Sequence, residues 1–368
     1  MSGSNQSLTA IALQKFRKNI WGVFSFGYIL LMFLIAVFAY VLAPDNSENA
    51  NQMHLSIHSK PPGFSTLMLF LPQEEITPKS WRDCFTGQTL NGTEIPILSY
   101  KIQNQKLVYQ EYSEDSSMAQ TKELLLNQFP GFKSFQSVED ELIQKRTFYL
   151  GTDKYGRDML SRMLVGSRVS ISIGFVAVFI SIVLGLFFGS VGGYFGGKWD
   201  AFVMWLVNVI WSIPTLLLVI AITLALGKGF WQVFVAVGLT MWVEVARVVR
   251  GQIISVKEMQ YVTAAKALGF SDFRIIANHI LPNIMAPIIV ISAANFASAI
   301  LVESGLSFLG LGAQPPIPSW GGMIKDHYNY IVLGKPYLAL VPGIAIMLIT
   351  LAFMMCGNAL RDALDVKT

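Results

Sequence analysis

Charged residues and cysteines are scarce in this sequence. Lysine, arginine, aspartate and glutamate make up 14% of the 368 residues and hydrophobic residues 53%, whereas about a quarter of a soluble domain is charged. The two cysteines, Cys84 and Cys356, are too few for a disulfide framework or a cysteine-based metal site. The composition excludes an ordinary soluble domain and predicts a chain embedded in a lipid bilayer.

Several motifs of catalytic proteins are also missing. The sequence has no Gly-x-x-x-x-Gly-Lys-Ser/Thr phosphate loop, so we expect no ATP site on this chain. It has neither His-Glu-x-x-His nor Gly-x-Ser-x-Gly, which counts against an intramembrane protease. The net charge of +4 comes without a basic and aromatic motif for nucleic acid. We therefore expect neither catalysis, a cofactor, a metal nor a nucleic-acid partner on this chain.

Six apolar segments are long enough to cross a bilayer, whose hydrocarbon core of about 30 Å needs about 20 helical residues. The first lacks a small-residue cleavage site and predicts a retained span. The fourth, residues 230–250, is uncharged up to Val243 and then carries Glu244, Arg247 and Arg250, which could form an i,i+3 pair between Glu244 and Arg247. The other five contain no charged residue: 21–42, 169–195, 201–226, 284–302 and 338–360.

Basic residues in the short flanks predict the orientation, because such residues accumulate on the cytoplasmic side. A cytoplasmic N-terminus and six spans put these flanks and the C-terminus inside: Lys15, Arg17, Lys18, Lys198, Arg247, Arg250, Lys257, Arg361 and Lys367. Arg157, Arg162 and Arg168 would lie outside, at the end of a long segment that translocates regardless of charge. The predicted division is a cytoplasmic tail 1–19, a first transmembrane helix 20–42, an external insertion 43–150, and a five-helix core 151–368 with a cytoplasmic loop 251–283.

The insertion has a turn-rich composition. Residues 95–102 and 106–112 alternate around 103–105 as in a β-hairpin, and residues 118–129 have the apolar spacing of a helix. We therefore expect a small folded domain of two elements.

The loop between the fourth and fifth predicted spans predicts two short helices. Residues 258–268 are rich in helix formers, Gly269 is a typical helix stop, and Ser271 or Asp272 can cap a second helix that ends before Pro282. The first helix has a modest apolar surface, made of Val262, Ala265, Ala267 and Leu268. This surface could contact another protein or its own transmembrane bundle, and the residues alone favour neither.

The same loop resembles the "EAA" loop of ABC importer permeases. The resemblance rests on Thr263-Ala264-Ala265, on Gly269 four residues later, and on Leu281-Pro282. Two positions depart from the pattern: Thr263 replaces an acidic residue and His279 replaces an apolar one, although His279 fits the peptide-permease branch. The resemblance implies a coupling helix that docks on an ATPase subunit, with these coupling residues: Tyr261, Thr263, Ala264, Ala265, Gly269, His279, Leu281 and Pro282.

Three further segments, residues 150–162, 304–321 and 361–365, resemble the oligopeptide and dipeptide C-type branch of this family. The resemblance implies an all-α integral membrane protein of the bacterial inner membrane that moves peptides or similar cargo inward by ATP-driven alternating access. It also implies a second permease subunit, two ATP-binding subunits that hold ATP and magnesium, and an external substrate-binding protein. The alternative from another class is an ion-coupled secondary transporter, but the inverted repeats and paired broken helices of that class are not evident.

Polar residues near or inside the apolar segments are the remaining candidates. Asn208 and Asn295, and with them Asn358, could line the substrate pathway or join helices by hydrogen bonds. Pro214 and Pro287 could kink their helices. Gly151-Thr152-Asp153 with Arg157-Asp158 could form a substrate or metal site, but i,i+4 spacing favours a bracing network of Asp153 with Arg157 and Asp158 with Arg162.

Overall fold

The computed structural model describes residues 8–73, 80–115, 117, 119–227 and 229–364. Met118, Asp365 and Lys367, which the sequence analysis used, lie outside these residues. The described chain forms two compact units. The first unit contains the residues up to Phe33, Ser170–Gln314 and the residues from Gly343 onward, and the second contains Leu34–Val169 and Pro315–Pro342.

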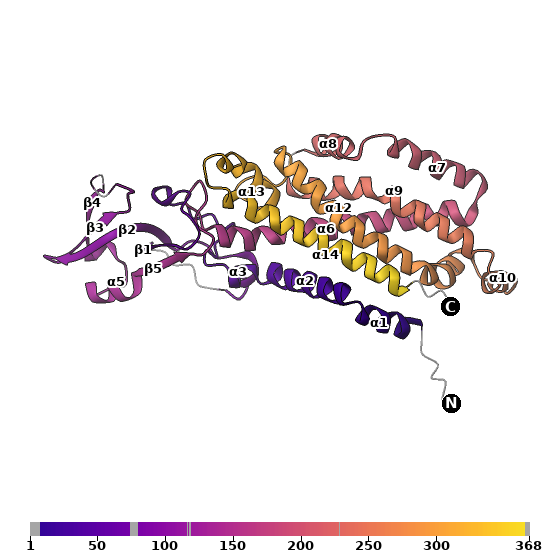
Figure 1. Cartoon of the computed structure of the whole chain (residues 1–368), viewed down its shortest axis with the longest axis horizontal. Coiled ribbons are helices and arrows are strands. Elements are labelled where there is room, and N and C mark those ends of the chain that lie inside the picture. Colours follow the sequence, from indigo (N-terminus) through magenta and orange to yellow (C-terminus); the bar gives the residue numbers. More distant parts are fainter. Residues whose placement is uncertain (1–7, 74–79, 116, 118, 228, 365–368) are drawn as a thin grey trace, which may run out of the picture. The chain divides into compact units, whose positions relative to one another are not determined.

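The first unit is helical (Figure 1). Its elements, several of which extend past the unit's limits, include a π-helical turn, η4, and a 3₁₀ turn, η5. They are α1 (Leu8–Lys18), α2 (Ile20–Val37), α6 (Met159–Phe195), α7 (Gly197–Trp211), α8 (Thr215–Leu226), α9 (Phe230–Val256), α10 (Gln260–Ala267), α11 (Asp272–Arg274), η4 (Ile275–Ile280), η5 (Leu281–Ile284), α12 (Met285–Phe308) and α14 (Tyr337–Leu364).

Five helical stretches are long and apolar enough to cross a membrane, or six if the bent pair of α7 and α8 is one span. All six predicted segments are helical, but several helices extend beyond their apolar runs. Helix α6 begins at Met159 and has 37 residues, which at 1.5 Å per residue is about 55 Å and exceeds the hydrocarbon core. The first predicted span is interrupted at Phe38, between α2 and a short helix α3 (Ala39–Leu42). Hydropathy marks only the part of a helix that faces lipid, so it misses such extensions.

Helices α6 and α9 pack closely through a row of glycines on α6. Gly185, Gly189 and Gly193 share one helix face because they are four residues apart. The α9 atoms nearest to a Cβ built at these glycines are, in the same order, Val245 Cβ at 2.5 Å, Ala246 O at 2.7 Å and Arg250 O at 3.0 Å. Residue numbers rise together along both helices, so α6 and α9 run parallel at the close approach typical of small-residue membrane interfaces.

The parallel arrangement requires the chain to return between α6 and α9, and the bent pair provides that return. Helices α7 and α8 meet at 91°, where Pro214 lacks an N–H and disfavours helix at the residue before it. Near the end of α9, the Arg250 guanidinium donates a hydrogen bond to Asp200 of α7. Near the start of α9, Val233 lies in one apolar cluster with Val219 of α8. The pair therefore follows α9 in reverse as one broken span, which makes six spans. The predicted third span is correct in position, and its helix breaks at Pro214, where the sequence indicates a kink.

An aromatic stack joins four helices of this unit. Phe33 of α2 lies edge-on to Phe175 of α6, with ring centroids 5.9 Å apart. Phe175 meets Phe296 of α12 at 4.8 Å, and Phe296 stacks on Phe353 of α14 at 3.8 Å. These contacts fix α2, α6, α12 and α14 to one another, because aromatic pairs at such separations add to their burial energy.

The second unit contains an antiparallel sheet with the strand order β4-β3-β2-β1-β5. Val138 and Leu142 of α5 share one apolar cluster with Leu69 of β1 and Leu107 of β3, so α5 covers one face of the sheet. The elements of this unit are α3, η1 (Leu55–Ile57), β1 (Phe64–Pro72), α4 (Asp83–Thr86), β2 (Gly92–Gln103), β3 (Lys106–Glu111), β4 (Thr121–Leu125), η3 (Leu126–Gln128), α5 (Phe135–Leu142), β5 (Ile143–Phe148), α13 (Trp320–His327) and η6 (Tyr328–Ile331).

The predicted hairpin is confirmed, whereas the predicted helix is wrong. Strands β2 and β3 pair from Gln103 and Lys106 outward. Asn104 and Gln105 between them have φ angles of 51° and 59°, as the tight turns of two-residue hairpins require. The described part of 118–129 forms strand β4 and the turn η3 instead of a helix. The domain therefore has more elements than the two expected.

Candidate functional site in the coupling segment and a membrane pocket

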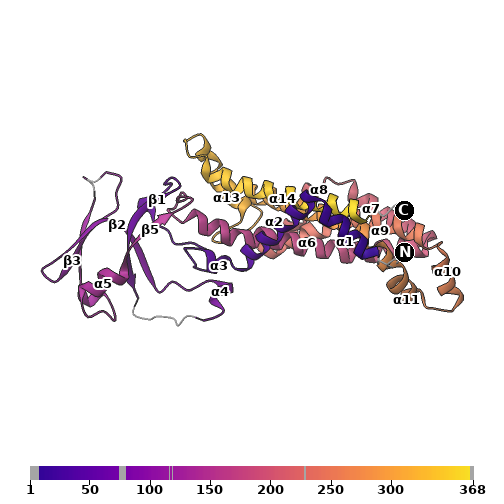
Figure 2. The same cartoon turned by 60° about the horizontal axis from the view of Figure 1, so that its bottom comes forward.

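The coupling segment, residues 257–283, connects α9 to α12 through α10, α11, η4 and η5. Figure 1 places α10 beyond the end of α9, and Figure 2 places both α10 and α11 there. Helix α10 begins after Met259, whose carbonyl accepts a hydrogen bond from the backbone N–H of Thr263 at 3.1 Å. Ser271 precedes α11, but its side chain makes no cap hydrogen bond. The first short helix that the sequence predicts is therefore confirmed, whereas the second does not end before Pro282, because α11, η4 and η5 continue into α12.

Gly269 reverses the chain at the end of α10. Its φ is +75°, a left-handed conformation that residues with a Cβ rarely adopt. The N–H of Phe270 donates to the carbonyl of Ala265 at 3.2 Å, and the N–H of Gly269 donates to the carbonyl of Lys266 at 2.9 Å. These two bonds form a Schellman motif. A Cβ at Gly269 would meet no atom within 4 Å, so the turn, and not crowding, requires glycine here.

One face of α10 packs against its own chain. Val262 is fully buried and Ala265 is 4% exposed. Both lie in one apolar cluster with Val249 and Ile253 of α9 and with Ile275 of η4. Of the two interpretations left open by the sequence, contact with the protein's own bundle therefore holds for this face of α10.

The opposite face of the segment is open. Tyr261, Thr263 and Ala264 are exposed, and so are Ala267 and Leu268. The most exposed apolar side chains of the segment are Met259 at 51%, Leu268 at 73% and Phe273 at 82%. The sequence analysis did not single out Phe273, because a phenylalanine beside a helix start has no signal that separates an exposed position from a buried one.

The last three predicted coupling residues lie where the segment joins α12. The His279 ring stacks on Phe270 with centroids 5.7 Å apart and an interplanar angle of 17°. The Asn283 side chain donates to the His279 carbonyl at 2.6 Å. Leu281 is half-buried against the same apolar cluster, and Pro282 is exposed in the first turn of η5. His279, Leu281 and Pro282 therefore shape the return of the chain, and His279 is a packing residue.

The pathway candidates are in different environments. Asn208 is exposed on α7. Asn295 on α12 is 2% exposed, and its Nδ2 has no hydrogen-bond partner among the described residues. Asn358, on α14, lines a pocket. The structure does not bring these three residues together.

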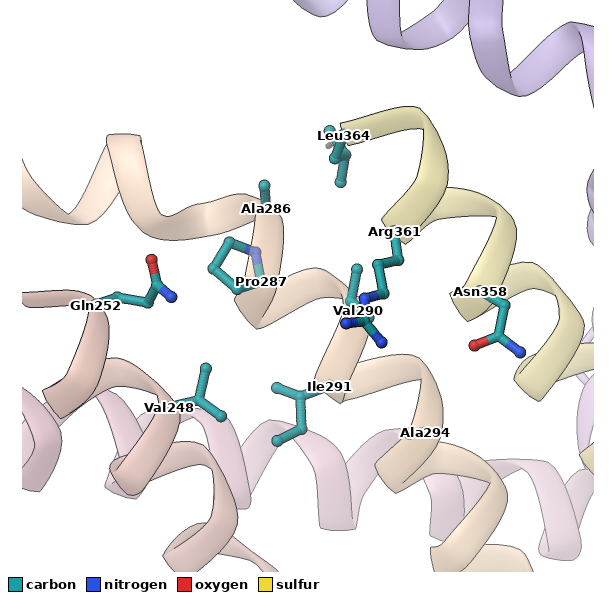
Figure 3. A pocket seen from close by; sticks show the side chains of 10 residues that line it. All are labelled: Val248, Gln252, Ala286, Pro287, Val290, Ile291, Ala294, Asn358, Arg361 and Leu364. Atoms are coloured by element: carbon teal, nitrogen blue, oxygen red, sulfur yellow. The ribbon is translucent and has the colours of Figure 1, made fainter. Parts of the chain in front are cut away.

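That pocket lies among α9, α12 and α14 and has a volume of about 640 Å³ (Figure 3). Gln252 of α9, Asn358 and Arg361 provide its polar groups, and Arg361 is the one ionisable side chain among its lining residues. The sequence analysis did not name Gln252, and it used Arg361 only for orientation. The apolar lining residues are Val248, Ala286, Pro287, Val290, Ile291, Ala294 and Leu364.

The predicted pair of Glu244 and Arg247 is not formed among the described residues. Glu244 is exposed. The Arg247 guanidinium instead lies 3.8 Å from the ring centroid of Trp211, the last residue of α7. A cation over an aromatic face is favourable, so Arg247 fastens α9 to the break between α7 and α8.

The charged residues before α6 form a structural network in the second unit. Arg157 Nε lies 2.6 Å from Asp153 Oδ2, which confirms that predicted pair. The pairing of Asp158 with Arg162 is wrong: Asp158 accepts the N–H of Ser161 at 2.9 Å and so caps α6, while Arg162 Nε lies 3.7 Å from Asp153. Burial raises the pKa of Asp158.

The same buried region includes His54 of the second unit. Burial and the nearby Arg146 guanidinium lower the pKa of His54 to about 4. Within the described residues no three histidine, cysteine or acidic side chains come together as metal ligands. The arrangement braces the start of α6 by ion pairs and hydrogen bonds.

Comparison with known proteins supplies the family. Residues 181–368 match the family described as binding-protein-dependent transport system inner membrane component. The chain belongs to this family. Residues 7–62 also match the N-terminal transmembrane domain of oligopeptide transport permease C. The protein is therefore a membrane permease subunit of an ABC importer and not an enzyme. Proteins of this family work with ATPase and substrate-binding partners, and ATP is hydrolysed on the ATPases. This membership sets aside the ion-coupled secondary transporter.

Two curated relatives illustrate the branch. The dipeptide transport system permease protein DppC of Alkalihalophilus pseudofirmus is 41% identical over 219 residues, which are 60% of this chain and 72% of the relative. The glutathione transport system permease protein GsiD of Pectobacterium atrosepticum is 38% identical over 219 residues, which are again 60% of this chain and 72% of the relative. An inward-facing structure of the MetNI methionine ABC transporter is 17% identical, with a TM-score of 0.47, and covers 56% of this chain and 97% of that one.

Proposed function

We propose that this permease moves short peptides or similar small cargo inward by ATP-driven alternating access. It acts beside a second permease subunit, two ATP-binding subunits and an external substrate-binding protein that delivers the cargo. The observation that carries this proposal is the coupling segment, which joins a packed apolar core on one side to exposed Leu268 and Phe273 on the other. Exposed apolar surface marks a protein contact site where it is contiguous. Relatives named for dipeptide and glutathione transport support the cargo class.

The coupling residues divide into two groups in this proposal. Tyr261, Thr263 and Ala264 contact the ATPase together with Leu268 and Phe273, because their side chains are open. The others fix the shape of the segment by packing, hydrogen bonds or turns: Ala265, Gly269, His279, Leu281 and Pro282. Thr263 supplies a neutral hydroxyl at this surface, so its contact with the ATPase is not ionic.

The pocket of Figure 3 forms part of the cargo path in this proposal. Its mixed lining suits a peptide, since apolar side chains can accept apolar cargo groups while Gln252 and Asn358 can bond amides. Arg361, without an acidic residue among the other lining residues, can pair with the terminal carboxylate that every unmodified peptide carries. The asparagines Asn208 and Asn295 do not line this pocket.

Transport is tested in vesicles that contain the full complex, with ATP inside and the loaded binding protein outside. We expect ATP-dependent accumulation of a labelled dipeptide. Arg361→Gln should lower uptake about tenfold, because a hydrogen-bonded charge pair stabilises by about 1.5 to 3 kcal/mol. Arg361→Lys keeps the charge and should retain most uptake. Equal uptake by the Gln variant and the wild type would remove Arg361 from the path, and no uptake by any complex would remove peptides from the cargo class.

The permease lies in a bacterial inner membrane in this proposal, with both termini and the coupling segment in the cytoplasm. Helix α1, the last turns of α14 and α10 lie at the same end of the first unit in both views (Figures 1 and 2). Residues 43–150, which contain the sheet, then form the external insertion.

The native cysteines test this orientation. Cys84 is exposed and Cys356 is buried. A membrane-impermeant maleimide should therefore label the wild-type chain in intact spheroplasts, and Cys84→Ser should abolish the signal. In that background Leu268→Cys, at a side chain 73% exposed in the chain alone, is expressed without the ATPases that would cover it and should be labelled only after the membrane is permeabilised. Labelling of Leu268→Cys in intact spheroplasts would reverse the orientation.

A further inference from the structure

Tyr194, in the last turn of α6, contacts both helices of the coupling segment. Its hydroxyl donates to Asp272 Oδ1 at 2.6 Å, at the start of α11. The Lys266 ammonium of α10 lies 5.1 Å from the centroid of the Tyr194 ring. The ring itself is 8% exposed and belongs to the apolar cluster that includes Val262 and Ala265. One side chain therefore touches the segment through a hydrogen bond, a cation over its ring, and packing.

The position of Tyr194 matters because of how the segment is connected. The backbone joins the coupling segment to α9 at one end and to α12 at the other, so motion of the segment reaches those two helices through the chain. Helix α6 has no such connection. The neighbouring Gly193 brings α6 against α9, with its Cβ position 3.0 Å from both the Arg250 carbonyl oxygen and Ile253 Cβ, but this is van der Waals contact without a hydrogen bond, whereas the bond to Asp272 has a direction.

The end of α6 also continues into α7. Gly196 and Gly197 follow with φ angles of +66° and +53°, which turn the chain into α7. Asp200, in the first turn of α7, forms an ion pair with Arg250 of α9, with Oδ2 to Nη2 at 2.6 Å. A displacement of Tyr194 thus acts at the point from which the broken span of α7 and α8 starts.

We infer that Tyr194 is a positioning residue that makes α6 follow the coupling segment when the ATPases move it. This inference rests on the proposed coupling function. The Tyr194 hydroxyl and the Asp272 carboxylate form the link, and Lys266 orients the ring from its face. Without the link the ATPases still dock and hydrolyse ATP. Helix α6 then no longer moves together with α9, and the cargo path does not open with each ATP cycle.

The test uses the complete reconstituted complex and measures labelled dipeptide moved per ATP hydrolysed. Tyr194→Phe removes only the hydroxyl and keeps the ring. We expect normal membrane level and normal ATPase retention, with transport per ATP lowered about tenfold, in line with the loss of one hydrogen bond to a charged group. Asp272→Ala should have the same effect, and the double variant should be no worse than either single one. Asp272→Asn keeps an acceptor and should restore most of the transport per ATP.

Tyr28→Phe is the matched control, because the described structure gives the Tyr28 hydroxyl of α2 no hydrogen bond. The number of dipeptides that this variant moves per ATP should equal that of the wild type. An unchanged ratio in Tyr194→Phe overturns the inference. A loss of membrane level and ATPase retention together would also overturn it, since that pattern marks a merely structural contact. A wild-type complex that moves no dipeptide would refute the proposed cargo instead, which separates the two failures.

Discussion

Replacing Gly189 by leucine should remove most of the permease from the membrane. A Cβ at this position would lie 2.7 Å from the Ala246 carbonyl oxygen and 2.7 Å from Val249 Cβ, closer than van der Waals contact permits. Because the first obstacle is backbone, no rotamer of the leucine relieves it, and α6 must move away from α9. Overpacking typically destabilises a protein by about 1 to 3 kcal/mol, and we expect a cost near the upper end of this range. The better helix propensity of leucine offsets about 1 kcal/mol of that cost relative to glycine.

The measurement is the membrane level of each variant and its thermal unfolding in detergent. Gly27→Leu is the matched control, because Gly27 lies in the apolar helix α2 and its Cβ would meet no atom within 4 Å. The control should stay near wild-type level. If Gly189→Leu accumulated as well as Gly27→Leu, the parallel contact of α6 and α9 would be wrong, and with it the argument that α7 and α8 form one broken span.

The spans were predictable because the bilayer imposes a simple requirement on sequence. A helix that faces lipid must be apolar over about 20 residues, and that pattern survives whatever its neighbours are. The break in the third span was less predictable. Pro214 indicates a kink, but the 91° bend depends on the packing of α7 and α8 along different parts of α9, which no local pattern encodes.

Strand β4 shows a different limit. The apolar residues of 118–129 have helical spacing, but Thr121–Leu125 of this stretch pair with β3, and two cross-strand ion pairs accompany the pairing. Lys122 Nζ lies 2.6 Å from Glu111 Oε1, and Lys106 Nζ lies 2.7 Å from Glu123 Oε2. The neighbouring strand therefore overrides a local preference, as is common for β-structure.

In the candidate site, the sequence indicated the segment but not the direction of its side chains. Gly269 was predictable as a helix stop, since its left-handed turn is a local property. The burial of Ala265 was not, because Ala264 and Ala265 are chemically identical and only the position of α9 distinguishes them. The bond from Tyr194 to Asp272 joins residues 78 positions apart, so it depends on the complete fold.

The difference between Ala264 and Ala265 provides the most direct test of the coupling surface. Ala265 is 4% exposed and packs with Val249 and Ile253, so Ala265→Trp should overpack the protein's own core and lower its membrane level. Ala264 is exposed, so Ala264→Trp should leave the level normal. If an ATPase surface covers Ala264, the added indole should weaken its association by about 1 to 3 kcal/mol, which is about five- to hundredfold.

Copurified ATPase per permease, membrane level and dipeptide uptake are measured for both variants, with Thr263→Ser as a control that keeps the hydroxyl at the exposed surface. Normal level with low ATPase retention for Ala264→Trp, beside low level for Ala265→Trp, is the expected pair of results. Full ATPase retention and uptake in Ala264→Trp would take the docking role away from this face of α10. A normal level of Ala265→Trp would show that α10 does not rest on α9 in the membrane, because a buried alanine without free space cannot accept an indole at no cost.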